Sequence, residues 1–171
     1  MRAILLVTAF VCVGAAGNLP ADAQAELDSV VASFEGHDLR LAEDWGDAGA
    51  CYQDAVDTRC YRTEAEMDAT ESVVRRTQAA PLASCSTTLR LYRSTNYGGG
   101  VLALSQRGTG IALSTFGFNN DTSSFRIGAC SAIFYDGGVG STQYSGGTAA
   151  GVWSAFMVSG WDNRVSTVYI Q

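Results

Sequence analysis

The pattern of hydrophobic and polar residues divides this chain near residue 85. After residue 85 the sequence is rich in β-branched, aromatic and glycine residues, whereas residues 24–84 are acidic and mixed. The whole chain has 19 glycines and two prolines, which indicates many tight turns. This pattern favours short strands over long helices and predicts a mostly β fold for the second half.

The acidic first half carries signals for both helix and strand. Residues 24–34 place large hydrophobic side chains at helical spacing and predict a helix, whereas residues 37–41 alternate like a short strand. Residues 51–52 and 59–61 are expected to pair as a hairpin. This half therefore predicts an α+β segment.

A second helix is expected after the hairpin. Thr63 and Glu66 have the spacing of a capping box, which opens a helix to about residue 76. Residues 78–84, with Ala-Ala-Pro, are expected to form a linker to the second half.

The second half repeats itself at an offset of 43 residues, without a gap. The matched positions include these pairs: Tyr92 and Tyr135, Gly117 and Gly160, Phe118 and Trp161, Ser123 and Ser166, Ile127 and Ile170. Two copies of this length, each with about four short strands, predict a sandwich of two sheets.

Charge is distributed unevenly and excludes one class of partner. The net charge is −6, and the 11 basic residues are all arginines. Such a balance lacks the basic surface that nucleic acid requires, so no nucleic-acid partner is expected. Residues 85–171 contain only three acids, Asp121, Asp136 and Asp162, and each of them falls in a predicted loop.

The N-terminus has the features of a secretory signal peptide. A basic start is followed by an apolar stretch that is too short to span a bilayer. Small residues allow cleavage after residue 16 or residue 23, and Pro20 favours residues 1–23 as the signal peptide. A secreted, extracellular protein is therefore predicted, with no membrane-spanning segment elsewhere in the chain.

Four cysteines remain after that cleavage, and an even number in a secreted chain indicates disulfides. Three pairings are possible. We favour Cys51–Cys60, which would close the N-terminal hairpin, and Cys85–Cys130, which would join strands of the second half.

Two matched loops carry the candidate chemistry. Residues 119–124 are Asn-Asn-Asp-Thr-Ser-Ser, and residues 162–167 are Asp-Asn-Arg-Val-Ser-Thr. Calcium binds six to eight oxygens from amides, carboxylates, hydroxyls and carbonyls. One such loop is typical of an ordinary turn, but its duplication at equal positions favours calcium binding.

The same residues carry a resemblance to a known family. Tyr92, Tyr97 and Gly99 stand at the spacing aromatic, four residues, aromatic, one residue, glycine, and residues 119–124 fit the pattern Asn/Asp-Asn/Asp-x-x-Ser/Thr-Ser. With these motifs the second half resembles the βγ-crystallin superfamily, in its bacterial secreted calcium-binding type. The second copy departs from the pattern at Gly140, Thr142 and Thr167.

The resemblance implies a two-motif Greek-key βγ-crystallin-like sandwich over residues 85–171, with an N-terminal α+β extension over residues 24–84. It also implies two calcium sites related by pseudo-twofold symmetry. The first would take its ligands from Asn120, Asp121 and Ser123 and from a carbonyl near Asp136. The second would take its ligands from Asn163, Arg164 and Ser166 and from a carbonyl near Arg93.

Two further expectations follow from the resemblance. Ser124 and Thr167 would bond back to the folded hairpins instead of binding the ion. The hairpin near Asp136 is glycine-rich and lacks the second aromatic, so the first site is expected to be the weaker one.

The sequence lacks the residues of most enzymes. His37 is the only histidine, which excludes a histidine-rich zinc site, and no Gly-x-Ser-x-Gly nucleophile motif is present. With the cysteines in disulfides no thiol is left for catalysis. We therefore expect a non-enzymatic, monomeric calcium-binding protein.

Alternative functions remain open from the sequence. The resemblance extends to small secreted metalloproteinase inhibitors of the same fold, and residues 137–151 could supply an inhibitory loop against a secreted protease. Trp153, Trp161 and Tyr144 could form a sugar platform, although packing is the more usual role of such tryptophans. Residues 24–84 are compatible with a pro-region, a partner-binding element or a second small domain.

Overall fold

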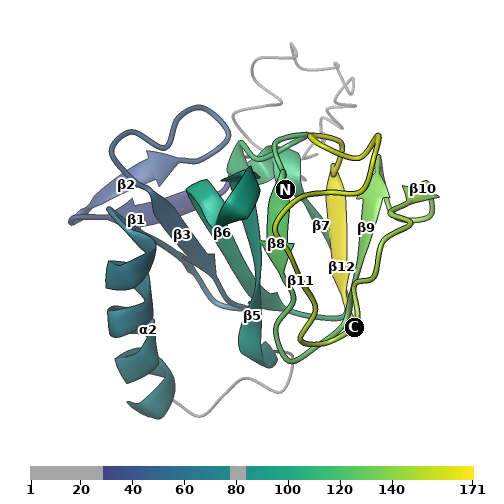
Figure 1. Cartoon of the computed structure of the whole chain (residues 1–171). Helices are drawn as coiled ribbons and strands as arrows, with labels where there is room; N and C mark the ends of the chain where they lie inside the picture. The colour runs from purple at the N-terminus through teal and green to yellow at the C-terminus, as the bar shows by residue number, and fades with distance from the viewer. Residues whose placement is uncertain (1–28, 78–83) are drawn as a thin grey trace, which may run out of the picture.

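The computed structural model describes residues 29–77 and 84–171 and has two β-sheets and one α-helix in these ranges (Figure 1). The first half contains these elements: β1 (Val31–Phe34), β2 (His37–Arg40), β3 (Ala50–Gln53), β4 (Thr58–Tyr61) and helix α2 (Glu64–Thr77). Residues 1–28 and 78–83, which include the expected signal peptide and most of the expected linker, lie outside the described residues.

The second half contains two successive four-stranded motifs. The first motif has β5 (Ser84–Ser94), β6 (Gly98–Gln106), β7 (Gly110–Ala112) and β8 (Ser124–Arg126). The second motif has β9 (Ala132–Asp136), β10 (Thr142–Gln143), β11 (Trp153–Ser154) and β12 (Thr167–Ile170). Short 3-10 turns, η1 (Thr95–Tyr97) and η2 (Leu113–Phe116), lie in the first motif.

The two motifs exchange one strand each. Strand β7 of the first motif pairs with β12 in the four-stranded sheet, whose order is β10-β9-β12-β7. Strand β11 of the second motif pairs with β8 in the larger sheet. This exchange joins the motifs into one unit, and it confirms the expected two-motif Greek-key sandwich.

The N-terminal strands extend the larger sheet. Strand β3 runs parallel to β6, with Cys51 opposite Leu102, and β4, β1 and β2 follow in that order. Residues from both sides of position 84 thus share one sheet. The mostly β fold with an N-terminal α+β extension is as expected, although the parallel β3–β6 pair is not apparent from local sequence.

The helix predicted over residues 24–34 is wrong for its described part. Residues Val31–Phe34 form strand β1, which pairs with β2 across a two-residue turn. The turn residues Glu35 and Gly36 have φ of 49° and 82°, the left-handed conformation that a tight hairpin requires. Ala32 and Phe34 are buried while Val31 is exposed, so the burial alternates with the period of a strand.

Helix α2 begins and packs as its sequence predicts. The Glu66 amide donates to Thr63 Oγ1 at 3.1 Å, which caps the first turn. Glu71, only 1% exposed, accepts hydrogen bonds from the Arg59 guanidinium and from the Tyr61 hydroxyl, at 2.8 and 2.6 Å. Burial and the bond to Glu71 raise the pKa of the Tyr61 hydroxyl above its usual value of 10.

Both expected disulfides, Cys51–Cys60 and Cys85–Cys130, are present. The first joins directly opposite residues of β3 and β4, and the second ties the start of β5 to the segment before β9. In the two described ranges no helix has the length and apolar character needed to cross a membrane.

Aromatic side chains fill the space between the sheets. Phe125 contacts Phe134 edge to face with ring centroids 5.1 Å apart, and Tyr144 contacts Trp161 in the same way at 5.3 Å. Tyr144 and Trp161 are buried, so neither can form a sugar platform together with Trp153. Trp161 packs in the core as expected, whereas Trp153 is 63% exposed and packs on the face of the sheet against Arg126.

Candidate calcium site

The two repeated loops lie side by side and bond to each other through the backbone. The Asn120 amide donates to the Val165 carbonyl at 3.0 Å, and the Asn163 amide donates to the Thr122 carbonyl at 3.1 Å. These bonds are equivalent under the 43-residue offset. Asn120 and Asn163 both have left-handed backbones, with φ of 54° and 56°, which asparagine tolerates better than most residues.

The candidate side-chain ligands pair across the loops. Ser123 Oγ donates to Asn163 Oδ1 at 3.2 Å, and Ser166 Oγ donates to Asn120 Oδ1 at 2.9 Å. The expected sites instead group Asn120 with Ser123 and Asn163 with Ser166, and that grouping of ligands stays a prediction. Each pair combines the hydroxyl of one motif with the amide oxygen of the other, because the two loops run past each other in opposite directions.

The spacing of these oxygens is that of ordinary hydrogen bonds and is also compatible with adjacent calcium ligands. Two ligands in adjacent positions around calcium, each about 2.4 Å from the ion, lie about 2.8–3.4 Å from each other. Both observed separations, 2.9 and 3.2 Å, fall in this interval. Asn120 and Asn163 are exposed at the loop surface, so an ion could reach both pairs from solvent.

Each loop is also held by an arginine–aspartate pair, and the two pairs have opposite polarity. In the first motif Arg93 of the hairpin binds Asp121 of the loop and donates to the Gly117 carbonyl at 3.1 Å. In the second motif Asp136 of the hairpin binds Arg164 of the loop. Arg164 donates to the Gly160 carbonyl, again at 3.1 Å.

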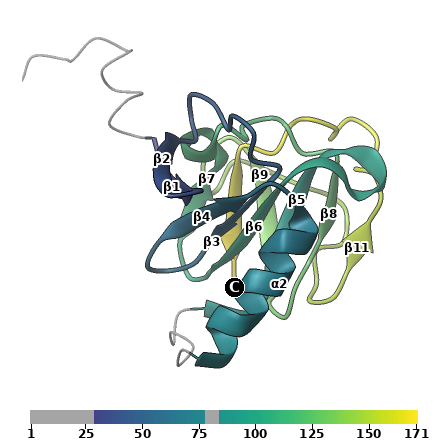
Figure 2. The ribbon, with the colours of Figure 1, turned by 90° about the vertical axis from the view of Figure 1, so that its left-hand side faces the viewer.

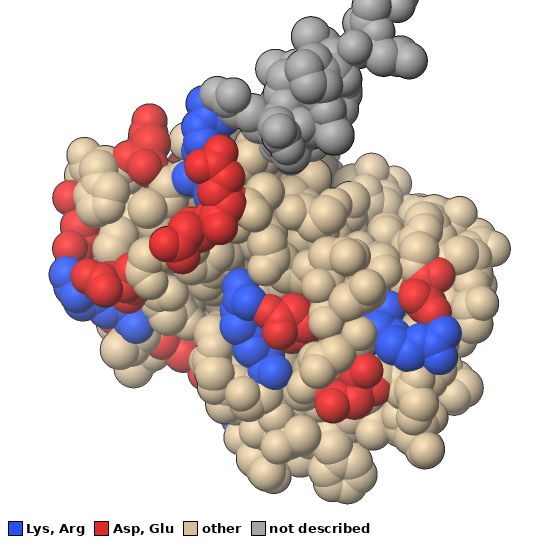
Figure 3. All heavy atoms as spheres, turned by 90° about the horizontal axis from the view of Figure 1, so that it is seen from above, with Lys and Arg blue, Asp and Glu red and all other residues tan. Residues whose placement is uncertain are grey.

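These ion pairs leave Asp162, exposed at the start of the second loop, as the one acid of residues 85–171 without an ion pair in the described structure. Asp121 and Asp136 are each neutralised by an arginine, so the four paired oxygens belong to neutral amides and hydroxyls. Within residues 29–77 and 84–171 no three histidine, cysteine, aspartate or glutamate side chains come together as a metal-binding group. Figure 3 accordingly shows this end of the molecule with acidic and basic side chains in small mixed groups.

The hairpins that would supply the further carbonyls both reach the loops. The Ser123 amide donates to the Tyr92 carbonyl at 2.9 Å, and the Ser166 amide donates to the Tyr135 carbonyl at 2.8 Å. Each hydroxyl therefore lies beside the hairpin of its own motif. This places Arg93 near the Ser123–Asn163 pair and Asp136 near the Ser166–Asn120 pair.

The structural role expected for Ser124 agrees with its contacts. Ser124 Oγ donates to the Ser94 carbonyl at 2.6 Å and accepts from the Tyr97 amide at 3.1 Å. These bonds fix the first hairpin against its loop. Thr167 is buried in β12 opposite Tyr135, and its expected bond to the second hairpin stays a prediction.

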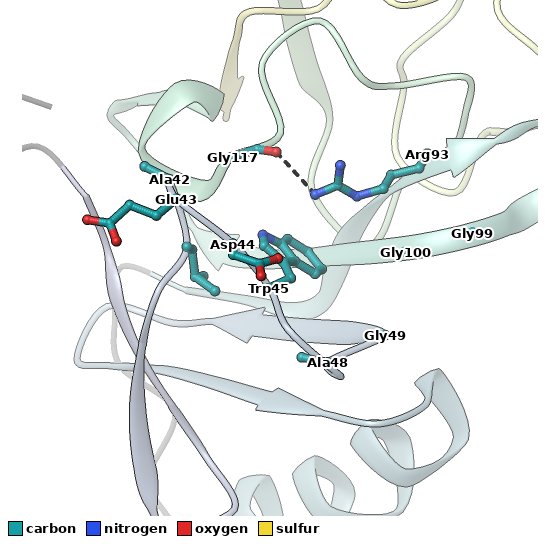
Figure 4. Close-up of a pocket in the computed structure, with 11 residues that line it drawn as sticks. Ala42, Glu43, Asp44, Trp45, Ala48, Gly49, Arg93, Gly99, Gly100 and Gly117 are labelled. Atoms are coloured by element: carbon teal, nitrogen blue, oxygen red, sulfur yellow. Dashed lines mark hydrogen bonds between the residues drawn. The ribbon is translucent and has the colours of Figure 1, made fainter. Parts of the chain in front are cut away.

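One contributor to the first loop was missed in the sequence, namely Trp45. Its Nε1 donates to the Phe116 carbonyl at 2.7 Å, and the Arg93 guanidinium lies against both the Trp45 and the Phe118 rings, 4.8 and 4.7 Å from their centroids. Figure 4 shows the guanidinium reaching past the indole toward Gly117. Only the spatial contact, and no local motif, identifies this residue.

Trp45 also borders a hollow of about 390 Å³ between the N-terminal segment and the first motif. Its rim includes Glu43, Asp44, Gly99 and Gly100. The N-terminal extension therefore lies against the arginine that holds the first loop, and it can influence that loop directly.

Residues 137–151, which the inhibitor alternative would use, are attached to the sandwich at several points. The Tyr144 amide donates to the Phe134 carbonyl at 2.9 Å, the Ala132 amide to the Thr148 carbonyl at 3.0 Å, and the Gly151 amide to the Gly128 carbonyl at 2.9 Å. Between these attachments much of the segment is exposed, most continuously over residues 138–143.

No protein-family model matches the chain, and no curated protein matches it.

Structure comparison returned βγ-crystallin domains. A βγ-crystallin from Ciona intestinalis is 22% identical over 49% of this chain and 99% of its own length, with a TM-score of 0.41. A βγ-crystallin domain from Clostridium beijerinckii is 19% identical over 48% of this chain and 95% of its own, with a TM-score of 0.40. The N-terminal domain of Protein S is 19% identical over 49% and 94%, with a TM-score of 0.40.

Proposed function

We propose that this protein is a secreted, non-enzymatic calcium-binding protein whose Greek-key domain is stabilised by the ion. The observation that supports this most directly is the crossed pairing of Asn120 with Ser166 and of Asn163 with Ser123, at separations of 2.9 and 3.2 Å. Each pair draws one oxygen from each motif. A cation held there would tie the two motifs together.

The chemistry of the ligands sets the strength of binding. Neutral amide and hydroxyl oxygens give calcium less electrostatic attraction than carboxylates do. In the calcium-free protein each serine hydroxyl donates to the asparagine oxygen. For calcium to bind, the hydroxyl must rotate its proton away from that oxygen, which breaks a hydrogen bond worth about 0.5–1.5 kcal/mol. We therefore expect dissociation constants of about 10⁻⁴–10⁻³ M, as in weak extracellular modules.

Calcium would act on stability by mass action. An ion that binds only the folded protein stabilises it by about 2.7 kcal/mol at a concentration of 100 times the dissociation constant. For a chain of this size that free energy corresponds to a rise in melting temperature of about 5–11 °C. The non-enzymatic assignment fits this role, since the ion would serve the fold and not a reaction.

Titration calorimetry together with thermal melting tests the proposal. Calcium at millimolar concentration should release or absorb measurable heat and raise the melting temperature, while magnesium should do so less. The double variant Ser123→Ala/Ser166→Ala should abolish both effects. Ser145→Ala, an exposed serine outside the loops, is the matched control and should keep them. Absence of heat and of a melting shift at about 10 mM calcium, ten times the weakest expected dissociation constant, would refute the proposal.

Secretion is tested separately. The mature protein recovered from culture medium should begin at residue 24 by N-terminal sequencing, in agreement with a signal peptide over residues 1–23. Light scattering of the same sample should give the mass of a monomer.

A further inference from the structure

A second site lies on the outer face of the larger sheet, beside helix α2. Three side chains stand directly opposite one another on adjacent strands, because Arg90 of β5 pairs with Arg126 of β8, and Arg126 pairs with Trp153 of β11. Figure 2 shows helix α2 in front of one part of this sheet, with β11 beside it and uncovered. A hollow of about 330 Å³ is lined by these three residues and by Thr87, Thr88 and Gly128.

The two arginines in this row differ in their partners. Arg90 is neutralised by helix α2, since it donates to Glu64 at 2.5 Å and binds Asp68. Arg126 has no ion pair with any described carboxylate, and its Nε is shielded from solvent without a hydrogen-bond partner. Like charges directly opposite each other in a sheet are destabilising. Arg90 has its counterions in helix α2, whereas no described carboxylate compensates the charge of Arg126.

Aromatic rings hold the free guanidinium in place. Arg126 lies 4.2 Å from the Tyr97 ring centroid and 4.9 Å from that of Trp153. Such stacking fixes the plane of the guanidinium and leaves its terminal nitrogens for a carboxylate, which arginine binds with two parallel hydrogen bonds. Trp153, exposed at 63%, presents a flat apolar face at the edge of the same hollow.

The far end of the hollow is rigid. Gly128 lies so close to β5 that a Cβ atom there would stand 2.2 Å from the Thr87 carbonyl oxygen. The Ile127 amide donates to the Val152 carbonyl at 2.7 Å, and the Cys85–Cys130 disulfide closes this corner. A preformed hollow of this kind needs little ordering when a ligand binds.

We infer that this hollow binds a carboxylate-bearing sugar, a uronic acid residue of an acidic polysaccharide. The Arg126 guanidinium would bind the carboxylate, the Trp153 ring would cover the apolar face of the sugar ring, and the exposed Thr87 would offer its hydroxyl to a sugar hydroxyl. The volume agrees with a ligand of one or two rings, since small-molecule pockets begin at about 300 Å³. This site is distinct from the calcium loops and does not depend on them.

The test uses trigalacturonate and its uncharged methyl ester as matched probes, on the full chain and with EDTA present. EDTA removes calcium, so failure here is separate from failure of the calcium proposal. The intrinsic fluorescence reports on the site, because Trp153 is exposed while Trp45 and Trp161 are 7% exposed. Trigalacturonate should change this fluorescence and bind at least about tenfold more tightly than the ester, a difference of about 1.4 kcal/mol.

Four variants complete the test, with binding measured by calorimetry and folding by thermal melting. Arg126→Gln should weaken trigalacturonate binding about tenfold and make the acid and the ester equal. Trp153→Ala should weaken both. Arg107→Gln and Phe156→Ala, an exposed arginine and an exposed aromatic outside the hollow, should leave binding unchanged.

Three results would overturn the carboxylate-binding site itself, and a fourth would overturn its assignment to a sugar. The first three are no binding of trigalacturonate at millimolar concentration, equal binding of the acid and the ester to the unmodified protein, and unchanged binding in a folded Arg126→Gln variant. Equal binding of a triglutamate peptide would also overturn the sugar assignment, because it would show a general site for anions.

Discussion

Replacing Asn120 by aspartate tests whether its side chain binds calcium. Asn120 Oδ1 accepts from Ser166 Oγ at 2.9 Å, and a carboxylate oxygen at the same place would accept that bond equally well. Aspartate also tolerates the left-handed backbone of this position, φ 54°. The calcium-free fold should therefore be unchanged, while the site gains one negative charge.

The structure sets the size of the effect. Two unit charges about 4 Å apart in water interact by about 1 kcal/mol, so a carboxylate beside a divalent ion contributes about 2 kcal/mol. The value for water is the appropriate one because Asn120 is exposed. This free energy corresponds to calcium binding about 30-fold tighter, and to a melting temperature about 4–8 °C higher in calcium.

Calorimetry and melting with and without calcium measure both quantities. Asn119→Asp is the control, because it adds the same net charge one residue earlier without a bond to the opposite loop. It should strengthen binding by less than about threefold, since exposed charges beyond direct contact are screened. Equal effects of the two variants, or no tightening by Asn120→Asp, would refute the role of Asn120 as a ligand.

Other predictions concern stability. Glu71→Gln should lower the free energy of unfolding by about 3 kcal/mol in urea at pH 7, because it removes the buried carboxylate that accepts two hydrogen bonds from the Arg59 guanidinium; a loss below about 1 kcal/mol would contradict this. Gly128→Ala should cost about 1–3 kcal/mol, since its Cβ would meet the Thr87 and Thr88 carbonyl oxygens at 2.2 and 2.4 Å. The control Gly147→Ala has no atom within 4 Å of the added Cβ and should stay within about 0.5 kcal/mol in the same urea experiment. Burial raises the pKa of Asp54, but hydrogen bonds from two backbone amides and from an arginine outweigh burial and hold it below its usual 3.8. The stability contributed by this carboxylate is thus present above pH 3.8 and is lost as the pH falls toward the lower folded value. Asp54→Asn should flatten the fall in stability below that pH, as measured by urea unfolding in a pH series, and an unchanged slope would exclude this carboxylate as a cause.

The sequence was sufficient for the architecture of the second half because its signals are local and repeated. The offset of 43 residues matches β5 with β9 and β8 with β12, and glycine-rich turns separate the strands. The hairpin at Cys51 and Cys60 and the capping box at Thr63 are local in the same sense. Each was predicted correctly because neighbouring residues alone determine it.

The errors arose where the answer depends on residues far apart in the chain. Val30, Val31 and Phe34 fit the helical period, and only the turn at Glu35 and Gly36 with its pairing to β2 decides for a strand. The crossed pairing of Asn120 with Ser166 could not be read from either loop, because it follows from the strand exchange between motifs. Likewise Trp45 and Arg126 have no sequence motif, and only their spatial neighbours distinguish them.

The parallel pairing of β3 with β6 has a consequence for the solubility of the sandwich. Residues 101–104 of β6 are almost completely buried, and β3 occupies the hydrogen-bonding edge of that strand. Without β3 this strand would present an open, hydrophobic edge of the kind that pairs with further chains and forms aggregates. The edge that the whole protein presents instead is β2, four residues long, with exposed His37, Asp38 and Arg40. We therefore expect residues 31–61 to prevent self-association of the second half. Residues 84–171 produced without them should form fibrils or precipitate.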